Sequence, residues 1–276
     1  SAPLFSAALG LNMMVKRFSA ALAALSLLGA GALWSGTAQA QCVSLTTVGV
    51  PSTQNFDTLA NSGTSSTLPT GWAFLETLAN ANTSYTAGTG SGTAGDTYSF
   101  GAAASTERAF GGLQSGTLLT TIGACFTNNT GGSITALDIG YTGEQWRLGT
   151  SGRAVPDRID FQYSLNATDL VTGTWVDVNA LDFVTPFTST TGATNGNAAA
   201  NRTALSSAIG SLAIANGATF WIRWVDLDAS GADDGLAVDD FALTPQALVL
   251  PTLSINDVSL NEGNAGTVSY IEQGGQ

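Results

Sequence analysis

The sequence predicts an all-β protein, an antiparallel two-sheet sandwich of the jelly-roll type. From about residue 43 to residue 245, apolar and polar side chains alternate with a period of two, as in strands that bury one face. Clusters rich in Gly, Asn, Ser and Thr, such as "GTGSGTAGD", "NNTGG" and "STTGATNGN", separate these runs and mark turns. About ten strands over roughly 200 residues suit two packed sheets.

Two segments show the alternation most clearly. In "DRIDFQYS", Ile159, Phe161 and Tyr163 alternate with polar residues, and in "TFWIRWVDL" one face carries Phe220 and Trp224. Further strands are expected over residues 118–128, 133–143, 173–178 and 236–244. Residues 200–217 are long enough for a short helix, which their Gly and Ser content disfavours.

The N-terminal region has the pattern of a secretory signal peptide over residues 14–40. Lys16 and Arg17 are followed by an apolar stretch and by an A-x-A motif that ends at Ala40. Residues 1–13 are interpreted as an upstream or fragment edge. A membrane anchor is the alternative, and the small residues of the apolar stretch disfavour it. We therefore expect a secreted or cell-surface protein with no membrane span after cleavage.

The composition excludes several kinds of function. The sequence has no histidine, which rules out a Ser-His-Asp triad, an H-E-x-x-H zinc site and a histidine general base. Lys16 is the only lysine and the arginines that follow are scattered, whereas nucleic-acid binding needs clustered cations. We expect no direct nucleic-acid binding by this chain.

The sequence contains two cysteines, Cys42 and Cys125. An exported protein meets oxidising conditions, so a disulfide between them is the favoured prediction. In the alternative, Cys125 is a buried apolar residue and Cys42 stays free near the new N-terminus.

Several longer phrases carry a family resemblance. "FDTLANSGTSSTLPTGWAF", "TYSFGAAASTERAFGGLQSG", "GEQWRLG" and "ATFWIRWVDLDASGADDGLAVDDFALT" resemble an N-terminal accessory jelly roll of large secreted bacterial proteins. In that group the module precedes a Calx-beta or lamin-tail domain and a hydrolase of the endonuclease/exonuclease/phosphatase or phytase-like type. The resemblance implies a module over residues 41–245 whose partners are downstream domains of the same polypeptide.

A second resemblance begins after a proline-bracketed linker at residues 246–252. "PTLSINDVSLNEGNAGTVSY" is similar to the opening strands of a Calx-beta domain, which makes residues 253–276 the truncated start of such a domain. The resemblance gives Glu262 as its one transferable calcium ligand. A glutamate in an ordinary turn is an equally good interpretation of that residue.

The stretch "DLDASGADDGLAVDDF" contains six aspartates in sixteen residues and suggests calcium. In a jelly roll, we expect one structural ion held by the first and last strands, here by Asp57 with Asp239 or Asp240. Successive residues of a strand point to opposite faces, so one member of the 239–240 pair should point inward. An inward carboxylate needs a cationic partner.

Asp226 and Asp228 form the second candidate calcium position. They match the first half of an EF-hand loop, but Ala237 stands where that loop requires a bidentate glutamate, so an EF-hand is excluded. Asp233 and Asp234 are interpreted as solvated loop residues.

Three functions fit these features. The favoured one is a non-catalytic, calcium-stabilised accessory module placed ahead of a hydrolase, such as an extracellular nuclease or phosphoesterase, that this chain does not contain. The alternative is a carbohydrate- or surface-binding module, with Trp146, Glu144 and Arg147 as the candidate ligand-binding residues; Trp72 and Trp175 are better explained as core. The third is a glycoside hydrolase with a carboxylate pair drawn from Glu76, Glu107 and Glu144.

Overall fold

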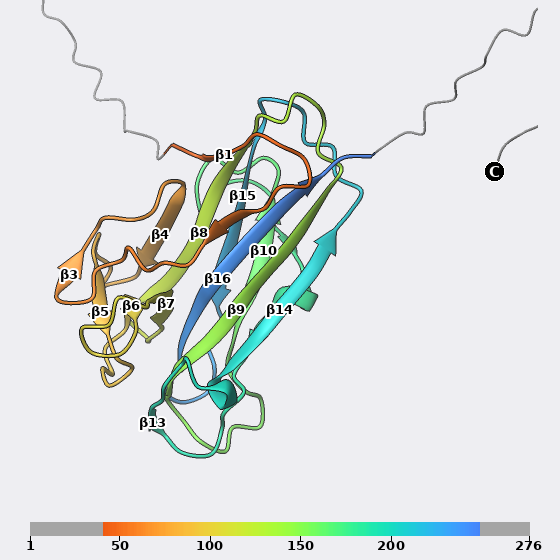
Figure 1. Cartoon of the computed structure of the whole chain (residues 1–276). Helices are drawn as coiled ribbons and strands as arrows, with labels where there is room; N and C mark the ends of the chain where they lie inside the picture. The colour runs from red at the N-terminus through yellow and green to blue at the C-terminus, as the bar shows by residue number, and fades with distance from the viewer. Residues whose placement is uncertain (1–40, 249–276) are drawn as a thin grey trace, which may run out of the picture. The chain divides into compact units, whose positions relative to one another are not determined.

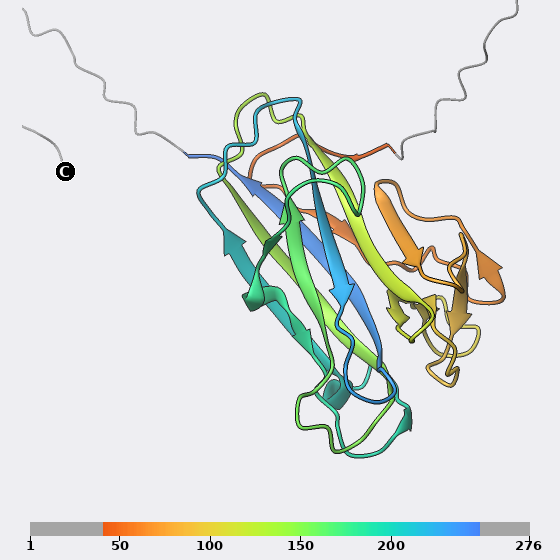
Figure 2. The same cartoon turned by 180° about the vertical axis from the view of Figure 1, so that it is seen from behind.

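The computed structural model describes residues 41–248, which form two layers of β-sheet (Figures 1 and 2). The two layers contain seven and nine strands. Apart from strands and loops, the described residues contain two short 3₁₀ turns, at Asn179–Leu181 and Ala199–Asn201. The prediction of an all-β sandwich is therefore confirmed.

The first sheet has the strand order β1-β8-β15-β10-β11, with β4 paired to β8 and β12 paired to β10. Its strands are β1 (Val43–Leu45), β4 (Trp72–Thr77), β8 (Leu119–Asn128), β10 (Arg158–Ser164), β11 (Val176–Asp177), β12 (Phe183–Val184) and β15 (Thr219–Asp226).

The second sheet has the order β13-β9-β16-β7-β6-β5-β3, with β14 paired to β9 and β2 paired to β16. Its strands are β2 (Ser52–Gln54), β3 (Thr64–Ser65), β5 (Tyr85–Gly88), β6 (Asp96–Phe100), β7 (Ala109–Leu113), β9 (Ala136–Leu148), β13 (Gly192–Ala193), β14 (Arg202–Ile209) and β16 (Gly235–Gln246).

One local expectation needs correction, and the doubt about a helix at residues 200–217 is confirmed. The sheets are mixed rather than purely antiparallel, because β1 runs parallel to β8 and β5 runs parallel to β6. Within residues 200–217, the segment that invited a helix forms β14, which pairs antiparallel with β9 along eight residues. Backbone hydrogen bonding to a long neighbouring strand gives this Ser- and Ala-rich segment its structure, because its own side chains are mostly exposed.

Aromatic rings from both sheets fill the space between the layers. Trp224 of β15 lies at their centre, and its ring is 5.2 Å from the rings of Tyr141 and Phe161 and 6.0 Å from Trp72. Phe241 of β16 packs edge-on to Trp224 at 5.8 Å. These inward residues are the alternating apolar residues of the sequence, so the period-two pattern built the core as expected.

A second, smaller core lies outside this space, on β8 and β15. Trp221, Cys125 and Leu170 are buried there, and Cys42 and Trp175 pack against them. Cys42 and Cys125 are joined in a disulfide, which attaches β1 to β8 across 83 positions of the sequence. The loop that follows β10 therefore closes over the outer face of the first sheet.

Some predicted features lie outside the described residues: the signal peptide at 14–40, the Calx-beta-like segment at 253–276 with Glu262, and most of the linker. Among residues 41–248, no helix has the length and apolarity that a membrane crossing requires.

Breaking the disulfide should lower stability, because the bond restricts a long loop in the unfolded chain. We expect Cys42→Ser to reduce the free energy of unfolding by about 2–4 kcal/mol, measured by urea denaturation. Reductant should lower the wild-type midpoint to that of the variant and leave the variant unchanged. A variant as stable as the oxidised wild type would contradict this expectation.

Candidate metal centre

Three carboxylates from distant parts of the sequence meet on the second sheet. Glu107 precedes β7, Glu144 lies in β9 and Asp239 lies in β16. One carboxylate oxygen from each residue lies within 4.8 Å of the others. In residues 41–248, this is the one group of three or more acidic side chains close enough to share a metal ion.

Strand pairing explains why these residues meet. Within the β9–β16 ladder, Ala237 is opposite Glu144 and Asp239 is opposite Thr142. Since residues two apart share a face, Glu144 and Asp239 project from the same side of neighbouring strands. On the other edge of β16, Phe110 of β7 is opposite Val238, which brings Glu107 to the same place.

The local contacts leave one fully buried carboxylate oxygen without a partner. Glu144 is fully buried; its Oε2 accepts a hydrogen bond from Trp146 Nε1 at 2.9 Å, and its Oε1 has none. Asp239 Oδ1 accepts the backbone N–H of Asp240 at 2.7 Å. The side-chain amide of Asn197 donates to Glu107. These contacts orient the three acids without neutralising them.

The electrostatics of the triad favour a bound cation or proton. Burial, then the neighbouring Glu144, Asp240 and Glu107, raises the pKa of Asp239 to about 9. Burial also raises the pKa of Glu144 to about 7, against the opposing effects of the hydrogen bond from Trp146 and of the charge of Arg202. Calcium suits such a site because it prefers oxygen ligands. It takes six to eight of them, so backbone carbonyls or waters would have to complete the shell around these three acids.

The sequence-predicted calcium residues are distributed differently. Asp239 belongs to the triad, whereas Asp240 is exposed, with φ 48° at a bulge in β16. Asp57 is also exposed and lies beyond the end of β2. Its carboxylate accepts the backbone N–H of Arg108 at 3.3 Å and the side chain of Asn55 at 2.6 Å. Asp57 therefore contacts the residue that follows Glu107 and lies outside the triad.

Glu107 and Glu144 were predicted only as candidates for catalysis or ligand binding. The third catalytic candidate, Glu76, lies elsewhere and accepts hydrogen bonds from Asn82 and from the backbone N–H of Thr97. Nothing in the spacing of these glutamates along the sequence indicates a shared site. The signal that joins Glu144 to Asp239 is the register between β9 and β16, which exists only after the sheet has formed.

A second acidic cluster surrounds Arg153. Arg153 Nη1 lies 3.0 Å from Asp234 Oδ1 and 3.4 Å from Asp157 Oδ2, and all three side chains are buried. Asp234 also accepts hydrogen bonds from the backbone N–H of Gly149 and the hydroxyl of Thr185. The prediction of a solvated loop at Asp233 and Asp234 is therefore wrong.

Asp226 and Asp228 do not share a site. Asp228 is exposed in the loop, whereas Asp226 is the last residue of β15 and faces the interior. Asp226 therefore belongs with the buried acids near Arg153, as described further below.

Trp146 does not provide the exposed aromatic surface that the carbohydrate interpretation required. It is 2% exposed and stacks on Phe100 with ring centroids 6.1 Å apart. A Cβ at Gly196 would lie 2.3 Å from Trp146 Nε1, so glycine at this position lets a loop cover the ring. Arg147 Nη1 donates to the carbonyl of Gly90 at 3.1 Å and fixes a second covering loop.

Among the tryptophans of residues 41–248, Trp175 is the most exposed: it packs against the smaller core on β8 and β15 but is only partly buried. The guanidinium carbon of Arg223 lies 3.9 Å from its ring centroid, and Trp175 Nε1 donates to the carbonyl of Thr172 at 2.9 Å. Trp175 is half-buried. Gln162 accepts a hydrogen bond from Arg223 Nε and donates one to Asp177, so polar groups border the ring.

Comparisons with known proteins found only distant similarity. No protein-family model matches the chain, and no curated protein matches it. A solved structure of the CBM22-1 xylan-binding domain from Paenibacillus barcinonensis Xyn10C is 12% identical over 74% of this chain and all of that chain, with a TM-score of 0.35.

Two further solved structures have similarly low scores. TmCBM61 in complex with beta-1,4-galactotriose is 12% identical over 52% of this chain and 74% of its own, with a TM-score of 0.29. The K3 cleaved adhesin domain of Lys-gingipain from Porphyromonas gingivalis is 12% identical over 70% and 91%, with a TM-score of 0.32.

Arg153 should be important for stability. Replacing it by leucine leaves Asp157 and Asp234 buried without a cation, and we expect Arg153→Leu to cost about 3–5 kcal/mol in urea denaturation at pH 7. Arg158→Leu is the matched control, because the Arg158–Asp160 pair is partly exposed and should contribute less than about 1 kcal/mol. Equal losses from the two variants would contradict the role of Arg153.

Proposed function

We propose that the sandwich is a non-catalytic module of an exported protein and that one calcium ion, held by Glu107, Glu144 and Asp239, stabilises it. The observation that carries the proposal is the triad, in which Glu144 and Asp239 are buried and Glu107 is partly buried, with the unpartnered Oε1 of Glu144. In this triad a cation would satisfy that oxygen and remove the repulsion between the three acids. The ion would have a structural role, because it would link the loop before β7 to the central strands β9 and β16.

Two further features support this proposal. Residues 41–248 contain neither lysine nor histidine, so arginine is the only basic side chain that could neutralise the triad. Arg202 faces Glu144 across the β14–β9 ladder but forms no ion pair with it in the described residues. An exported protein would also meet enough calcium to fill a weak site.

Thermal unfolding tests the calcium site directly. Saturating calcium should raise the wild-type melting temperature at pH 7.5 by about 5–10 °C relative to EDTA, since a hundredfold excess over Kd contributes about 2.7 kcal/mol. Glu144→Gln and Asp239→Asn should abolish the shift, because each replaces a carboxyl group that calcium can deprotonate and bind by an amide of the same shape. Magnesium at equal ionic strength serves as the control for screening.

Asp57→Asn separates two versions of the site. If calcium requires only the triad, this variant keeps the wild-type shift. Loss of the shift in Asp57→Asn, with retention in Glu144→Gln, would move the ion to the end of β2. No calcium shift in the wild type would reject calcium stabilisation altogether.

Trp175 favours carbohydrate binding as a second candidate function. Its ring is anchored by Arg223 and by Thr172 before any ligand arrives, so stacking on a sugar would cost little side-chain entropy. Gln162 and Asp177 can hydrogen-bond hydroxyl groups beside it. The net charge of −12 disfavours anionic ligands, so the expected ligand is a neutral polysaccharide.

Affinity electrophoresis in gels containing neutral polysaccharides tests this candidate. We expect the wild type to be retarded by at least one polymer and Trp175→Ala to lose at least about tenfold in affinity, in line with a buried aromatic contact. Leu165→Ala, a change at an exposed residue of the preceding loop, should bind as the wild type does. Equal retardation of both variants would place binding elsewhere, and no retardation by any polymer would reject it.

A further inference from the structure

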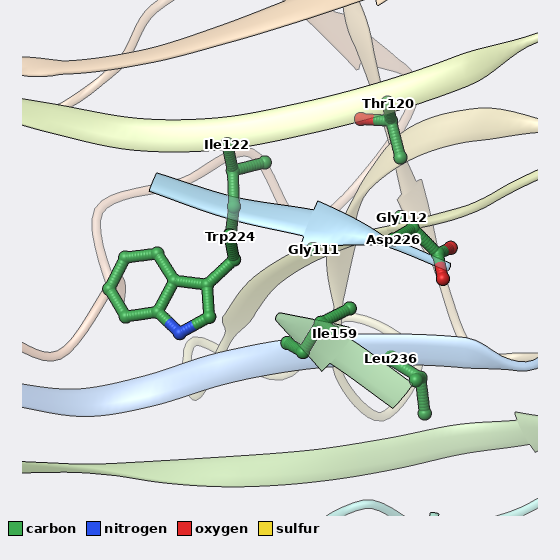
Figure 3. Close-up of a pocket in the computed structure, with 8 residues that line it drawn as sticks. All are labelled: Gly111, Gly112, Thr120, Ile122, Ile159, Trp224, Asp226 and Leu236. Carbon is green, nitrogen blue, oxygen red and sulfur yellow. The ribbon is translucent and has the colours of Figure 1, made fainter. Parts of the chain in front are cut away.

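Asp226 lies at the edge of a small cavity between the two sheets. As the last residue of β15, it follows the inward-facing Trp224 by two positions and points to the same face. The cavity has a volume of about 10 Å³. Figure 3 shows Asp226 near Thr120 at one side of the lining residues and Trp224 at the other. This volume accommodates about one water molecule.

Both carboxylate oxygens of Asp226 lack a partner in the described residues. Asp226 is 9% exposed, and neither Oδ1 nor Oδ2 has a hydrogen-bond partner, because the adjacent backbone N–H of Leu227 donates to the carbonyl of Arg158 at 3.2 Å. An ionised carboxylate in this position would cost several kcal/mol, because it has lost its water without gaining a cation or a donor. The carboxyl group must therefore be neutralised either by a cation bound in the cavity or by a proton.

The charged groups around Asp226 make an ionised carboxylate at this position still less favourable. Asp157, before β10, and Asp233 and Asp234, before β16, all act on it as negative neighbours. Arg153 Nη1 pairs with Asp157 and Asp234, and in the described residues Arg153 forms no ion pair with Asp226.

The remaining elements around the cavity supply no charge. β7 contributes Gly111 and Gly112, β10 contributes Ile159 and β16 contributes Leu236. β8 contributes Ile122 and Thr120, whose hydroxyl is already hydrogen-bonded to the hydroxyl of Thr97 at 2.7 Å. No cationic side chain lines the cavity.

A metal ion does not fit this cavity. Calcium takes six to eight oxygen ligands, whereas the side-chain oxygens lining the cavity are those of Asp226 and Thr120. Asp226 also does not belong to a group of three acidic side chains that could share an ion in residues 41–248. A proton needs no such shell.

We propose that Asp226 is a proton-binding site: its carboxyl group stays protonated at neutral pH and donates its hydrogen to a single water molecule in the cavity. Ionisation in alkaline solution then breaks this contact and places a charge beside Asp157 and the loop between β15 and β16. Burial, followed by the charges of Asp157 and Asp233, raises the pKa of Asp226 well above its ordinary value, in agreement with this geometry.

The sign of the pH effect follows from this assignment. In the unfolded chain, Asp226 loses its proton near its ordinary pKa of about 3.9. In the folded chain it holds the proton to higher pH, so folding takes up a proton between the two values. Stability from this residue is therefore greatest below pH 4 and is lost as the pH rises toward the folded-state pKa.

Spectroscopy on the wild-type protein tests the proton directly. We expect infrared difference spectra of the protein in EDTA at pH 7 to contain a carbonyl band of a protonated carboxyl that persists in the Glu144→Gln/Asp239→Asn double variant, in which the two buried acids of the triad cannot contribute. Asp226→Asn should remove that band. Asp228→Asn, which alters an exposed acid two residues away, should leave it unchanged. A band absent at pH 7, or insensitive to Asp226→Asn, would overturn the proposal.

Thermal unfolding in EDTA gives an independent measurement. Relative to the wild type, Asp226→Asn should melt about 3–6 °C higher at pH 8.5 and no higher at pH 4, because the amide cannot ionise. Asp228→Asn should show a difference that does not change with pH. A pH-independent difference for Asp226→Asn would also overturn the proposal.

Calcium distinguishes this site from the triad. Added calcium should leave the protonated carboxyl band of Asp226 in place, and Asp226→Asn should keep the calcium-dependent rise in melting temperature. Loss of the band on calcium addition would mean that Asp226 binds the metal, and would contradict the proton site. Failure of calcium to stabilise the wild type would reject the triad proposal and leave the proton test intact.

Discussion

A chain segment without lysine or histidine has few means of neutralising a carboxylate that folding buries. The sandwich buries several carboxylates, and these fall into three groups according to the partner that is available to each. Arg153 neutralises the pair of aspartates beside it. Glu107, Glu144 and Asp239 have the arrangement of ligands for a cation. Asp226 has neither a basic side chain as a partner nor further acidic side chains with which to share a metal ion. A proton is the neutralising group that fits its cavity. The electrostatics of burial therefore decide which partner each acid needs.

Strand β16 connects the two acidic clusters and the aromatic core. It pairs with β9, β7 and β2, and it carries Asp239 while the loop that precedes it carries Asp234. Phe241 of the same strand contacts Trp224 in the aromatic core. A change in the charge of one acidic cluster therefore acts on a strand that also positions the other cluster and the core. The bulge after Asp239 separates its buried side chain from the exposed Asp240 within one strand.

The strands could be predicted from the sequence because alternation along a strand is a local property. The core aromatic residues followed from the same pattern. The candidate sites could not be predicted from this pattern, because they depend on pairings between distant segments. Asp233 and Asp234 look solvated in their Gly- and Ser-rich loop, yet Arg153, about eighty residues earlier, buries Asp234. Trp146 looks exposed between Gly143 and Gly149, but the distant Gly196 allows its loop to close over the ring. Glu144 joins Asp239 only through strand register.

The disulfide also has a mechanical consequence. A pulling force applied at Cys42 passes through the covalent bond to Cys125 in β8, one of the strands of the first sheet. While the bond is intact, the loop of 83 positions between the cysteines cannot lengthen, which withholds about 290 Å of contour at roughly 3.5 Å per residue. Reduction would release that length. The oxidation state of two sulfur atoms thus sets how far the module can extend under tension.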